Sequence, residues 1–222
     1  PVITALEADK DVFVEKPLCL RLDEAQTLIE LAQQRNRILM VGHLLQYHPC
    51  IQQLRQLVRE GVLGRLHYIT SNRLNLGKFR QEENALWSFA PHDISVILAL
   101  AGNRLPRRIR CVGESYLNHG VADTTLTTLR FDDHLCAHVY VSWLNPFKEQ
   151  KLTVVGSDGM AVFDDTRPWP EKLVLYRRYL TWENGQIPIP ARGQGECIAV
   201  PEAEPLACEC RHFLECCAQR QT

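Results

Sequence analysis

The pattern of apolar and polar positions near the start of the chain predicts a strand, a helix and a second strand. Val12-Phe13-Val14 is an unbroken apolar run of the kind found in strands covered on both faces. Pro17 cannot donate to a sheet and predicts the end of that strand. Apolar residues then recur at helical spacing over about 22–35, and a second apolar run over 38–41 closes at Gly42. Two strands joined by a crossover helix with short links should be parallel.

Prolines and glycines mark expected helix ends in the next part of the chain. Pro49 and Gly61 bracket a predicted helix whose buried stripe is Ile51, Leu54 and Val58. A strand over 66–74, a polar loop over 75–84 and a helix over about 91–100 follow, and Pro91 suits the first turn of that last helix.

From residue 107 onward the sequence contains runs in which apolar and polar residues alternate or which are rich in β-branched residues. These runs predict an antiparallel-rich sheet. Residues 155–160 have the composition of a hairpin turn. The stretch 183–205 has no clear period and is predicted to be a loop, and 206–217 a last helix. The predicted strands cover 107–117, 123–131, 135–144, 150–155, 160–164 and 172–178.

The composition is that of an ordinary globular protein and narrows the function by exclusion. Of the 222 residues, 45% are hydrophobic and 23% charged, with a net charge of -1. Without a basic excess or a long apolar run, we expect neither a nucleic-acid nor a membrane partner. The nine cysteines and the lack of a secretory signal predict reduced thiols and a cytoplasmic location. The run C-E-C-R-H-F-L-E-C-C at 208–217 lacks paired C-x-x-C spacing, so helix packing is favoured there and no metal site is predicted.

Two stretches carry candidate chemistry. Glu15 and Lys16 lie at the carboxyl end of the first strand, and His43 at that of the second, so the parallel arrangement predicts that they share the sheet edge where ligands bind. A surface ion pair at a strand end is the alternative. His92 and Asp93 follow Pro91 at the expected helix start, where the helix dipole would favour a neutral imidazole suited to a general base. Asp93 could orient that imidazole or simply cap the helix.

Five landmarks in order lend these stretches more weight: EKP after an apolar strand, then VGHLLQYHP, LGRLHYITSNRLNLG, LWSFAPHDISVIL and WLNPFKEQKLTVVGSDGMAVFDD. With them the chain resembles the Gfo/Idh/MocA family of NAD(P)-dependent oxidoreductases over nearly its whole length. Within the family it looks most like the branch that acts on nucleotide sugars.

The resemblance implies an α/β fold, α+β overall, with a Rossmann parallel sheet followed by a mixed, mostly antiparallel sheet with helices on one face. Residues 1–45 would be the C-terminal remnant of the dinucleotide-binding domain, and 46–222 the domain for substrate binding and oligomerisation. It implies NAD or NADP as cofactor, a sugar or nucleotide-sugar substrate, and a homo-oligomer that could form through the sheet face. The implied catalytic residues are Lys16, His92 and Asp93; the cofactor-binding residues are Glu15, Lys16, Pro17, His43 and Gln46; and the substrate-binding residues are Tyr47, His48, Arg73, Asn75 and Lys78.

The chain also departs from the family pattern. It contains no Gly-x-Gly-x-x-Gly turn, the element that normally holds the cofactor pyrophosphate. Ala90 replaces a glycine, Ser88 stands where many members carry aspartate, and Gln46 stands where arginine is expected. We therefore expect a chain truncated at the N-terminus, and at the C-terminus as well, that binds NAD weakly. The expected function is hydride transfer between NAD(P) and a secondary alcohol of a sugar. The alternative is a non-catalytic fragment or degraded copy that binds sugar nucleotide or pairs with a like subunit.

Overall fold

The computed structural model divides the chain into two compact units. One unit combines Pro1–His48 with Ala203–Thr222, and the other is Pro49–Glu202. The sequence predicted a boundary between residues 45 and 46. In the structure the first unit extends to His48 and also includes the C-terminal segment Ala203–Thr222. The structure describes residues 1–77, 79–81, 83–117, 119–177, 180–185, 187–190 and 194–221. Within these ranges no helix has the length and apolar character needed to cross a bilayer.

The first unit confirms the predicted strand–helix–strand start. Strands β1 (Val12–Glu15) and β2 (Leu39–Gly42) are parallel, and helix α2 (Leu22–Gln34) connects them. A short helix α1 (Val2–Glu7) precedes β1, and the 3₁₀ turn η1 (Leu44–Tyr47) follows β2. The buried centre of this unit is apolar and draws on the first two helices and β1, through Leu6, Val12, Leu28 and Ala32.

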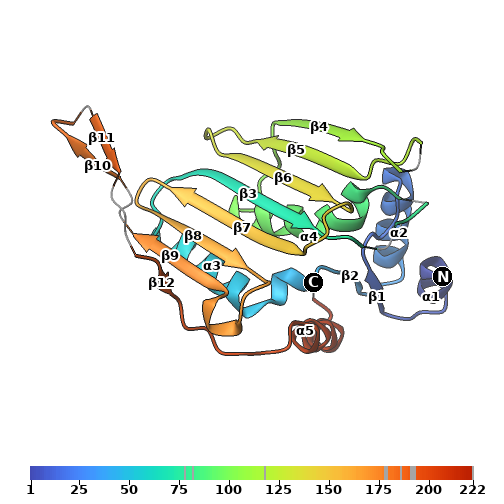
Figure 1. Ribbon diagram of the computed structural model, residues 1–222. Coiled ribbons are helices and arrows are strands. Elements are labelled where there is room, and N and C mark those ends of the chain that lie inside the picture. Colours follow the sequence, from blue (N-terminus) through green and yellow to red (C-terminus); the bar gives the residue numbers. More distant parts are fainter. Residues whose placement is uncertain are drawn as a thin grey trace. The chain divides into compact units, whose positions relative to one another are not determined.

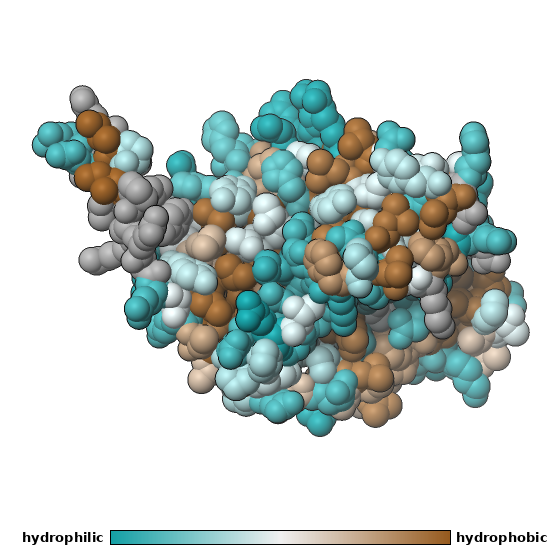
Figure 2. Space-filling view, in the orientation of Figure 1, coloured by the Kyte–Doolittle hydropathy of each residue, from teal (hydrophilic) through white to brown (hydrophobic). Residues whose placement is uncertain are grey.

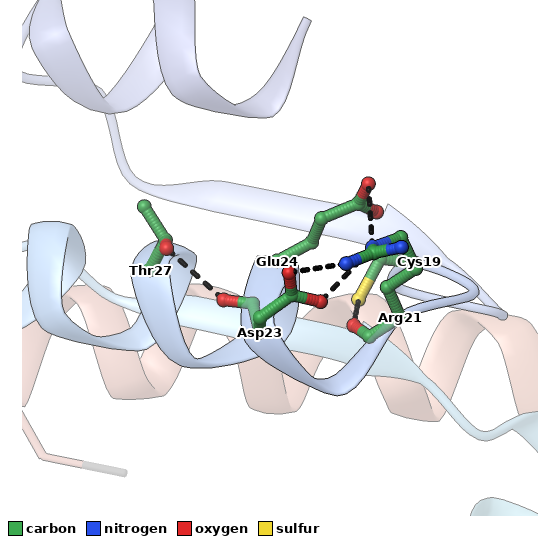
Figure 3. Close-up of polar contacts among 5 residues, drawn as sticks. All are labelled: Cys19, Arg21, Asp23, Glu24 and Thr27. Atoms are coloured by element: carbon green, nitrogen blue, oxygen red, sulfur yellow. Dashed lines mark hydrogen bonds and ion pairs between the residues drawn. The ribbon is translucent and has the colours of Figure 1, made fainter.

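Local polar contacts hold the start of α2 (Figure 3). The Arg21 guanidinium donates to both carboxylate oxygens of Asp23, at 3.0 and 2.7 Å, and lies 3.9 Å from Glu24. The Thr27 hydroxyl donates to the Asp23 carbonyl at 3.0 Å, and the Cys19 thiol to the Arg21 carbonyl at 3.1 Å. Two carboxylates in the first turn also complement the positive end of the helix dipole. The turn from β1 into α2 is therefore organised by residues within a few positions of one another.

The C-terminal helix α5 (Pro205–Gln219) completes the first unit. The Phe213 ring stacks on that of Phe13, with centroids 5.5 Å apart. Beyond the helix end, Arg220 donates to the Asp11 carboxylate at 2.7 Å and to the Asn36 carbonyl. These contacts join the C-terminal segment to β1, to the residue before it and to the link between α2 and β2.

The second unit is built on an eight-stranded sheet with the order β12-β9-β8-β7-β3-β6-β5-β4. Only β3 and β6 are parallel neighbours, so the predicted antiparallel-rich sheet is confirmed. Helices α3 (Pro49–Arg59) and α4 (Ala85–Leu100) lie on one face, and Figure 1 views the sheet from the opposite, open face. The strands are β3 (Leu66–Leu74), β4 (Arg108–Glu114), β5 (Thr124–Arg130), β6 (Cys136–Ser142), β7 (Glu149–Gly156), β8 (Gly159–Asp164), β9 (Leu173–Arg177) and β12 (Glu196–Cys197), with a separate pair β10 (Leu180–Glu183) and β11 (Ile187–Pro190) and a 3₁₀ turn η2 (Trp169–Glu171).

Strand alternation sorts the side chains of this sheet between its two faces. On β3, Ile69 and Ser71 are buried, and their cross-strand partners Ala137 and Val139 on β6 are buried as well. The alternate residues of these two strands face the other side, where Tyr140 of β6 is 37% exposed. The helices thus cover one set of positions and leave the alternate set open.

The structure corrects three details of the predicted elements. Helix α4 begins at Ala85 and not near residue 91, and the Asn84 side chain caps it by accepting the Trp87 N–H at 3.1 Å. Pro91 removes one backbone donor, yet the helix continues because much of its length is buried against the sheet. The stretch 183–205, predicted to be a loop, contains β11 and β12. On α3, Leu57 is buried in place of Val58, since residues three or four positions after Leu54 reach nearly the same face.

We expect Phe213→Ala to lower the free energy of unfolding of the first unit by about 1–3 kcal/mol, because it removes a partly buried ring and an aromatic pair. Amide protection at Val12–Glu15 should fall in hydrogen exchange, while protection in β5 and β6 stays unchanged. Leu214→Ala is the matched control, because Leu214 lies on the same helix and is 65% exposed. Equal effects of the two substitutions would contradict a packing role for Phe213.

Candidate functional site

The carboxyl edge of the parallel pair gathers the side chains predicted from the EKP stretch. Glu15 and Gly42 are cross-strand partners, so Lys16 and His43 follow the two strands at the same edge. Lys16 and His43 are half-buried, whereas Glu15 is exposed. Burial lowers the pKa of His43, and the positive charge of Lys16 lowers it further. The edge therefore presents an ammonium beside an imidazole that is neutral near pH 7.

A buried carboxyl group at this edge escaped the sequence analysis. Glu209 of α5 is only 1% exposed and accepts the backbone N–H of His43. Burial raises the pKa of Glu209; the His43 N–H opposes that rise, and the negative charge of Glu15 adds to it. Glu209 thus fixes the backbone at the end of β2 and holds its proton to a higher pH than an exposed glutamate does.

Two further residues of α5 extend this group. The Tyr47 hydroxyl lies 2.7 Å from His212 Nδ1, and His212 Nε2 lies 3.4 Å from the Cys216 sulfur. Burial raises the pKa of Tyr47, and the acidic groups of Glu209 and Cys216 raise it further. Glu209, His212 and Cys216 are spaced three and four positions apart on one helix face, a signal that was available in the sequence.

The remaining predicted residues of this region lie on the same short segments. Pro17 follows Lys16 through a cis peptide bond and is half-buried. Gln46 is half-buried in η1, where its backbone N–H donates to the His43 carbonyl at 2.8 Å. His48 is buried, with 5% of its surface exposed. The structure therefore brings the predicted cofactor-binding residues, together with Tyr47 and His48, to the carboxyl end of β1 and to the segments that follow β1 and β2.

The second unit holds Asp93 in a buried ion pair. Arg73 of β3 donates to the Asp93 carboxylate from Nε at 2.6 Å and from Nη2 at 3.2 Å, and the Ser71 hydroxyl donates to it at 2.8 Å. The side chains of Arg73 and Asp93 are 12% and 6% exposed. Asp93 therefore does not cap the start of α4; it joins α4 to an interior strand of the sheet.

The environment of His92 also differs from the expectation. His92 lies inside α4, several residues beyond the helix start at Ala85. Because the helix dipole acts within the first turn, it does not account for a neutral imidazole at this position. Its own side chain is half-buried.

Two more predicted substrate-binding residues belong to this unit, and a third cannot be placed. Asn75 follows β3 and is half-buried, and its backbone N–H donates to the Ser142 carbonyl at 3.1 Å. The guanidinium of Arg73 is engaged by Asp93 and, in the amide orientation that satisfies both partners, by the Gln150 side chain at 3.0 Å. Lys78 lies outside the described residues. Among the residues that the structure describes, no three His, Cys, Asp or Glu side chains converge to hold a metal ion.

Comparison with known proteins relates both units to one family. Residues 1–43 match the NAD-binding Rossmann-fold model of the GFO/IDH/MocA oxidoreductases, and residues 51–162 match the model of the GFO/IDH/MocA C-terminal domain. UDP-N-acetylglucosamine 3-dehydrogenase from Acidithiobacillus ferrooxidans is 26% identical over 215 residues, which cover 96% of this chain and 64% of the relative.

Solved structures agree with this relationship. An oxidoreductase from Magnetospirillum magnetotacticum is 27% identical with a TM-score of 0.82, over 98% of this chain and 68% of that protein. An inositol dehydrogenase homologue from Azotobacter vinelandii, solved with NADH and myo-inositol, is 22% identical with a TM-score of 0.78, over 99% of this chain and 62% of its own. The chain spans between about a third and two thirds of the length of the curated relatives that it matches.

We expect Asp93→Asn to destabilise the second unit by about 3–5 kcal/mol, because it leaves the buried Arg73 guanidinium without its counter-ion. Urea unfolding measures the change. Asp132→Asn is the control, because Asp132 pairs with Arg107 across 3.6 Å on the surface, and it should change stability by less than about 1 kcal/mol. Replacing both Arg73 and Asp93 by apolar residues should cost less than Asp93→Asn alone; a greater cost would contradict this account.

The raised pKa of Glu209 predicts a pH-dependent stability. An unfolded glutamate ionises near 4.5, whereas folded Glu209 ionises at higher pH, so its contribution to stability is present at low pH and declines as the pH rises through the folded pKa. Glu209→Gln keeps an acceptor for the His43 N–H without a charge. The variant should gain stability over the parent as the pH rises from about 4 to 8. Thermal unfolding across that range measures it, and a constant difference would refute the assignment. Glu215→Gln, an exposed change on the same helix, is the control.

Proposed function

Because the chain belongs to the GFO/IDH/MocA oxidoreductase family, we propose that it serves hydride transfer between NAD and a secondary alcohol of a sugar or nucleotide sugar. The observation that carries the proposal is the edge of the parallel pair, where Lys16 and a neutral His43 follow the two strands. Ligands of open α/β sheets bind at this edge. The similarity to UDP-N-acetylglucosamine 3-dehydrogenase supports a nucleotide sugar as the substrate class.

The donor set at this edge fits the nicotinamide end of the cofactor. The Lys16 ammonium can hydrogen-bond to ribose hydroxyls, and its charge would stabilise negative charge that develops on the substrate oxygen. Gly42 has no side chain at the end of β2. A Cβ added there would lie 3.5 Å from the Phe13 ring and 3.6 Å from the Glu15 carboxylate, so it would fill space at this edge that the glycine leaves open. When bound, NAD accepts the hydride from the alcohol carbon.

Oxidation of an alcohol also requires a group that removes the hydroxyl proton. We assign this role to His92, because an imidazole exchanges a proton near neutral pH, whereas the Lys16 ammonium would first have to lose its own. The ion pair of Asp93 with Arg73 holds the helix that carries His92, so Asp93 acts in this proposal as a positioning residue. Lys16 holds the oxygen and the ribose.

The open face of the sheet supports a proposed homo-oligomer. It carries exposed Tyr68, Leu126 and Tyr140, which are 44%, 44% and 37% exposed. Large side chains of this kind are enriched in the centres of protein interfaces. Light scattering on the purified protein tests the proposal, and a monomer at micromolar concentration would refute it.

We expect His92→Ala to lower kcat by about 10²–10⁴ without a comparable change in the KM for NAD, the usual effect of losing an acid/base group. Lys16→Ala should lower kcat and also raise the KM for NAD, because Lys16 contacts both oxygen and cofactor in the proposal. The assay follows NADH formation with UDP-N-acetylated sugars and inositols, in the longest form of the protein that its gene encodes.

The exposed residues His67 and Lys10 supply matched controls. His67→Ala and Lys10→Ala should keep kcat and KM within about twofold of the parent. Near-normal turnover of His92→Ala in an active enzyme would exclude His92 as the base. Absence of NADH formation by the parent with every sugar tested would overturn the proposed function itself.

A further inference from the structure

Three arginines line a pocket at the β4 edge of the large sheet. Arg108 and Arg110 come from β4, and Arg130 and Thr128 from the neighbouring β5. Arg108 is directly opposite Arg130 in the strand register, and Arg110 is opposite Thr128. Figure 2, which views the open face, shows a hydrophilic group over β4 at the upper edge of the sheet.

The pocket lies on the face opposite α4. Along β5, the buried residues Thr125, Thr127 and Leu129 alternate with the partly or fully exposed residues Leu126, Thr128 and Arg130. Helix α4 contacts β5 and its neighbour β6 on the buried side. The pocket is therefore separated by the sheet from the ion pair that holds α4.

Among the residues that the structure describes, no carboxylate neutralises the positive charges of this pocket. The acidic residues of the nearby β5–β6 turn are already paired, Asp132 with Arg107 at 3.6 Å and Asp133 with Arg104 at 2.6 Å. Across the described part of the chain, no carboxylate forms an ion pair with Arg108, Arg110 or Arg130. Like charges placed directly opposite one another on neighbouring strands are destabilising. Charged side chains on an edge strand can by themselves prevent it from pairing with another chain. That role would need neither two arginines opposite each other on neighbouring strands nor a pocket.

A positioned hydroxyl group completes the pocket. The Thr128 hydroxyl lies 3.2 Å from His138 Nδ1 on β6, and His138 Nε2 lies 3.5 Å from the Cys136 sulfur. These contacts restrict the rotation of the Thr128 hydroxyl, and Thr128 lines the pocket together with the three arginines as an uncharged hydrogen-bonding residue. A planar guanidinium matches two oxygens of a phosphate at once, and three arginine side chains line this pocket.

We propose that this pocket is a second ligand site, which binds the phosphate or diphosphate group of a soluble small-molecule ester. The bound oxyanion neutralises the opposed Arg108–Arg130 pair, Arg110 adds a third set of donors, and Thr128 supplies the uncharged contact. The site is independent of the proposed dehydrogenase chemistry, because none of its residues belongs to the edge of the parallel pair or to α4.

Calorimetric titration of the 222-residue chain with pyrophosphate at low salt tests the proposal. We expect saturable binding at one site per chain. Arg108→Gln and Arg110→Gln should each weaken it by about tenfold to a hundredfold, since each removes charge-assisted hydrogen bonds. Arg107→Gln is the matched control: it removes the same charge one position before β4, from a residue that pairs with Asp132 and does not line the pocket, and should change the affinity by less than twofold. Circular dichroism confirms that the variants fold, as expected for exposed positions on an edge strand.

Three outcomes would overturn the proposal. One is an absence of saturable pyrophosphate binding, or an equal loss in Arg107→Gln, which would indicate diffuse surface charge. Another is binding only to vesicles of phosphatidylcholine and phosphatidylglycerol, which would replace a soluble ester by a lipid headgroup. The third is a change of mass in light scattering on Arg110→Gln without pyrophosphate binding by the parent, which would make the arginines part of an interface between copies. Retention of pyrophosphate binding by Lys16→Ala would separate this site from the proposed cofactor edge, and its loss would refute the separation.

Discussion

The carboxylate of Asp93 is the constraint on which the second unit depends. It sits almost entirely out of solvent, and Ser71 and Arg73 donate to it from the same face of β3. A buried ion pair contributes little net stability compared with apolar packing, but breaking it leaves an uncompensated charge in the interior. The pair therefore selects one rotation and one register of α4 on the sheet and penalises the others. Each residue of α4, His92 included, takes its place from that choice.

Along β3, β5 and β6, successive side chains point to opposite faces of the sheet, so the two faces carry different groups. Odd-numbered positions such as Ser71 face the helix layer and build the support for α4. Even-numbered positions such as Thr128 and His138 face the open side, where the arginines of β4 add charge. A substitution on one face therefore leaves the chemistry of the other face largely unaltered, although both are parts of the same strands.

The stability of the first unit depends on helix α5, which comes from the C-terminal end of the chain. A parallel pair with one crossover helix buries little apolar surface by itself, and two-stranded sheets are marginal in water. Helix α5 supplies Phe213 against Phe13, and Arg220 joins Asp11 to the Asn36 carbonyl. The same helix brings Glu209 to the backbone of His43, so the element that stabilises the unit also shapes its polar edge.

Much of the secondary structure could be predicted from short-range pattern. The limits of β1, α2 and β3 agree with their apolar periodicity and bounding residues, and the parallel direction of β1 and β2 follows from their short links to α2. The EKP stretch was correctly placed at a strand end because a proline stops a ladder wherever the strand lies. The family was recognisable for a related reason: its landmarks are local strings whose order is preserved along the chain.

The start of α4 and the partners of Asp93 depended on contacts between distant segments. Local rules place Pro91 in a first helical turn, but burial of α4 against the sheet outweighs the loss of one backbone donor, so the helix starts at Asn84–Ala85. The spacing of Glu209, His212 and Cys216 was visible, yet only the packing of α5 in the first unit shows that they meet His43 and Tyr47. Likewise, the opposition of Arg108 and Arg130 is a matter of strand register. Periodicity tells which residues share a face, because it follows from the geometry of a single helix or strand. Which faces pack together is decided by the free energy of burying them against each other. Those contacts exist only in the folded chain.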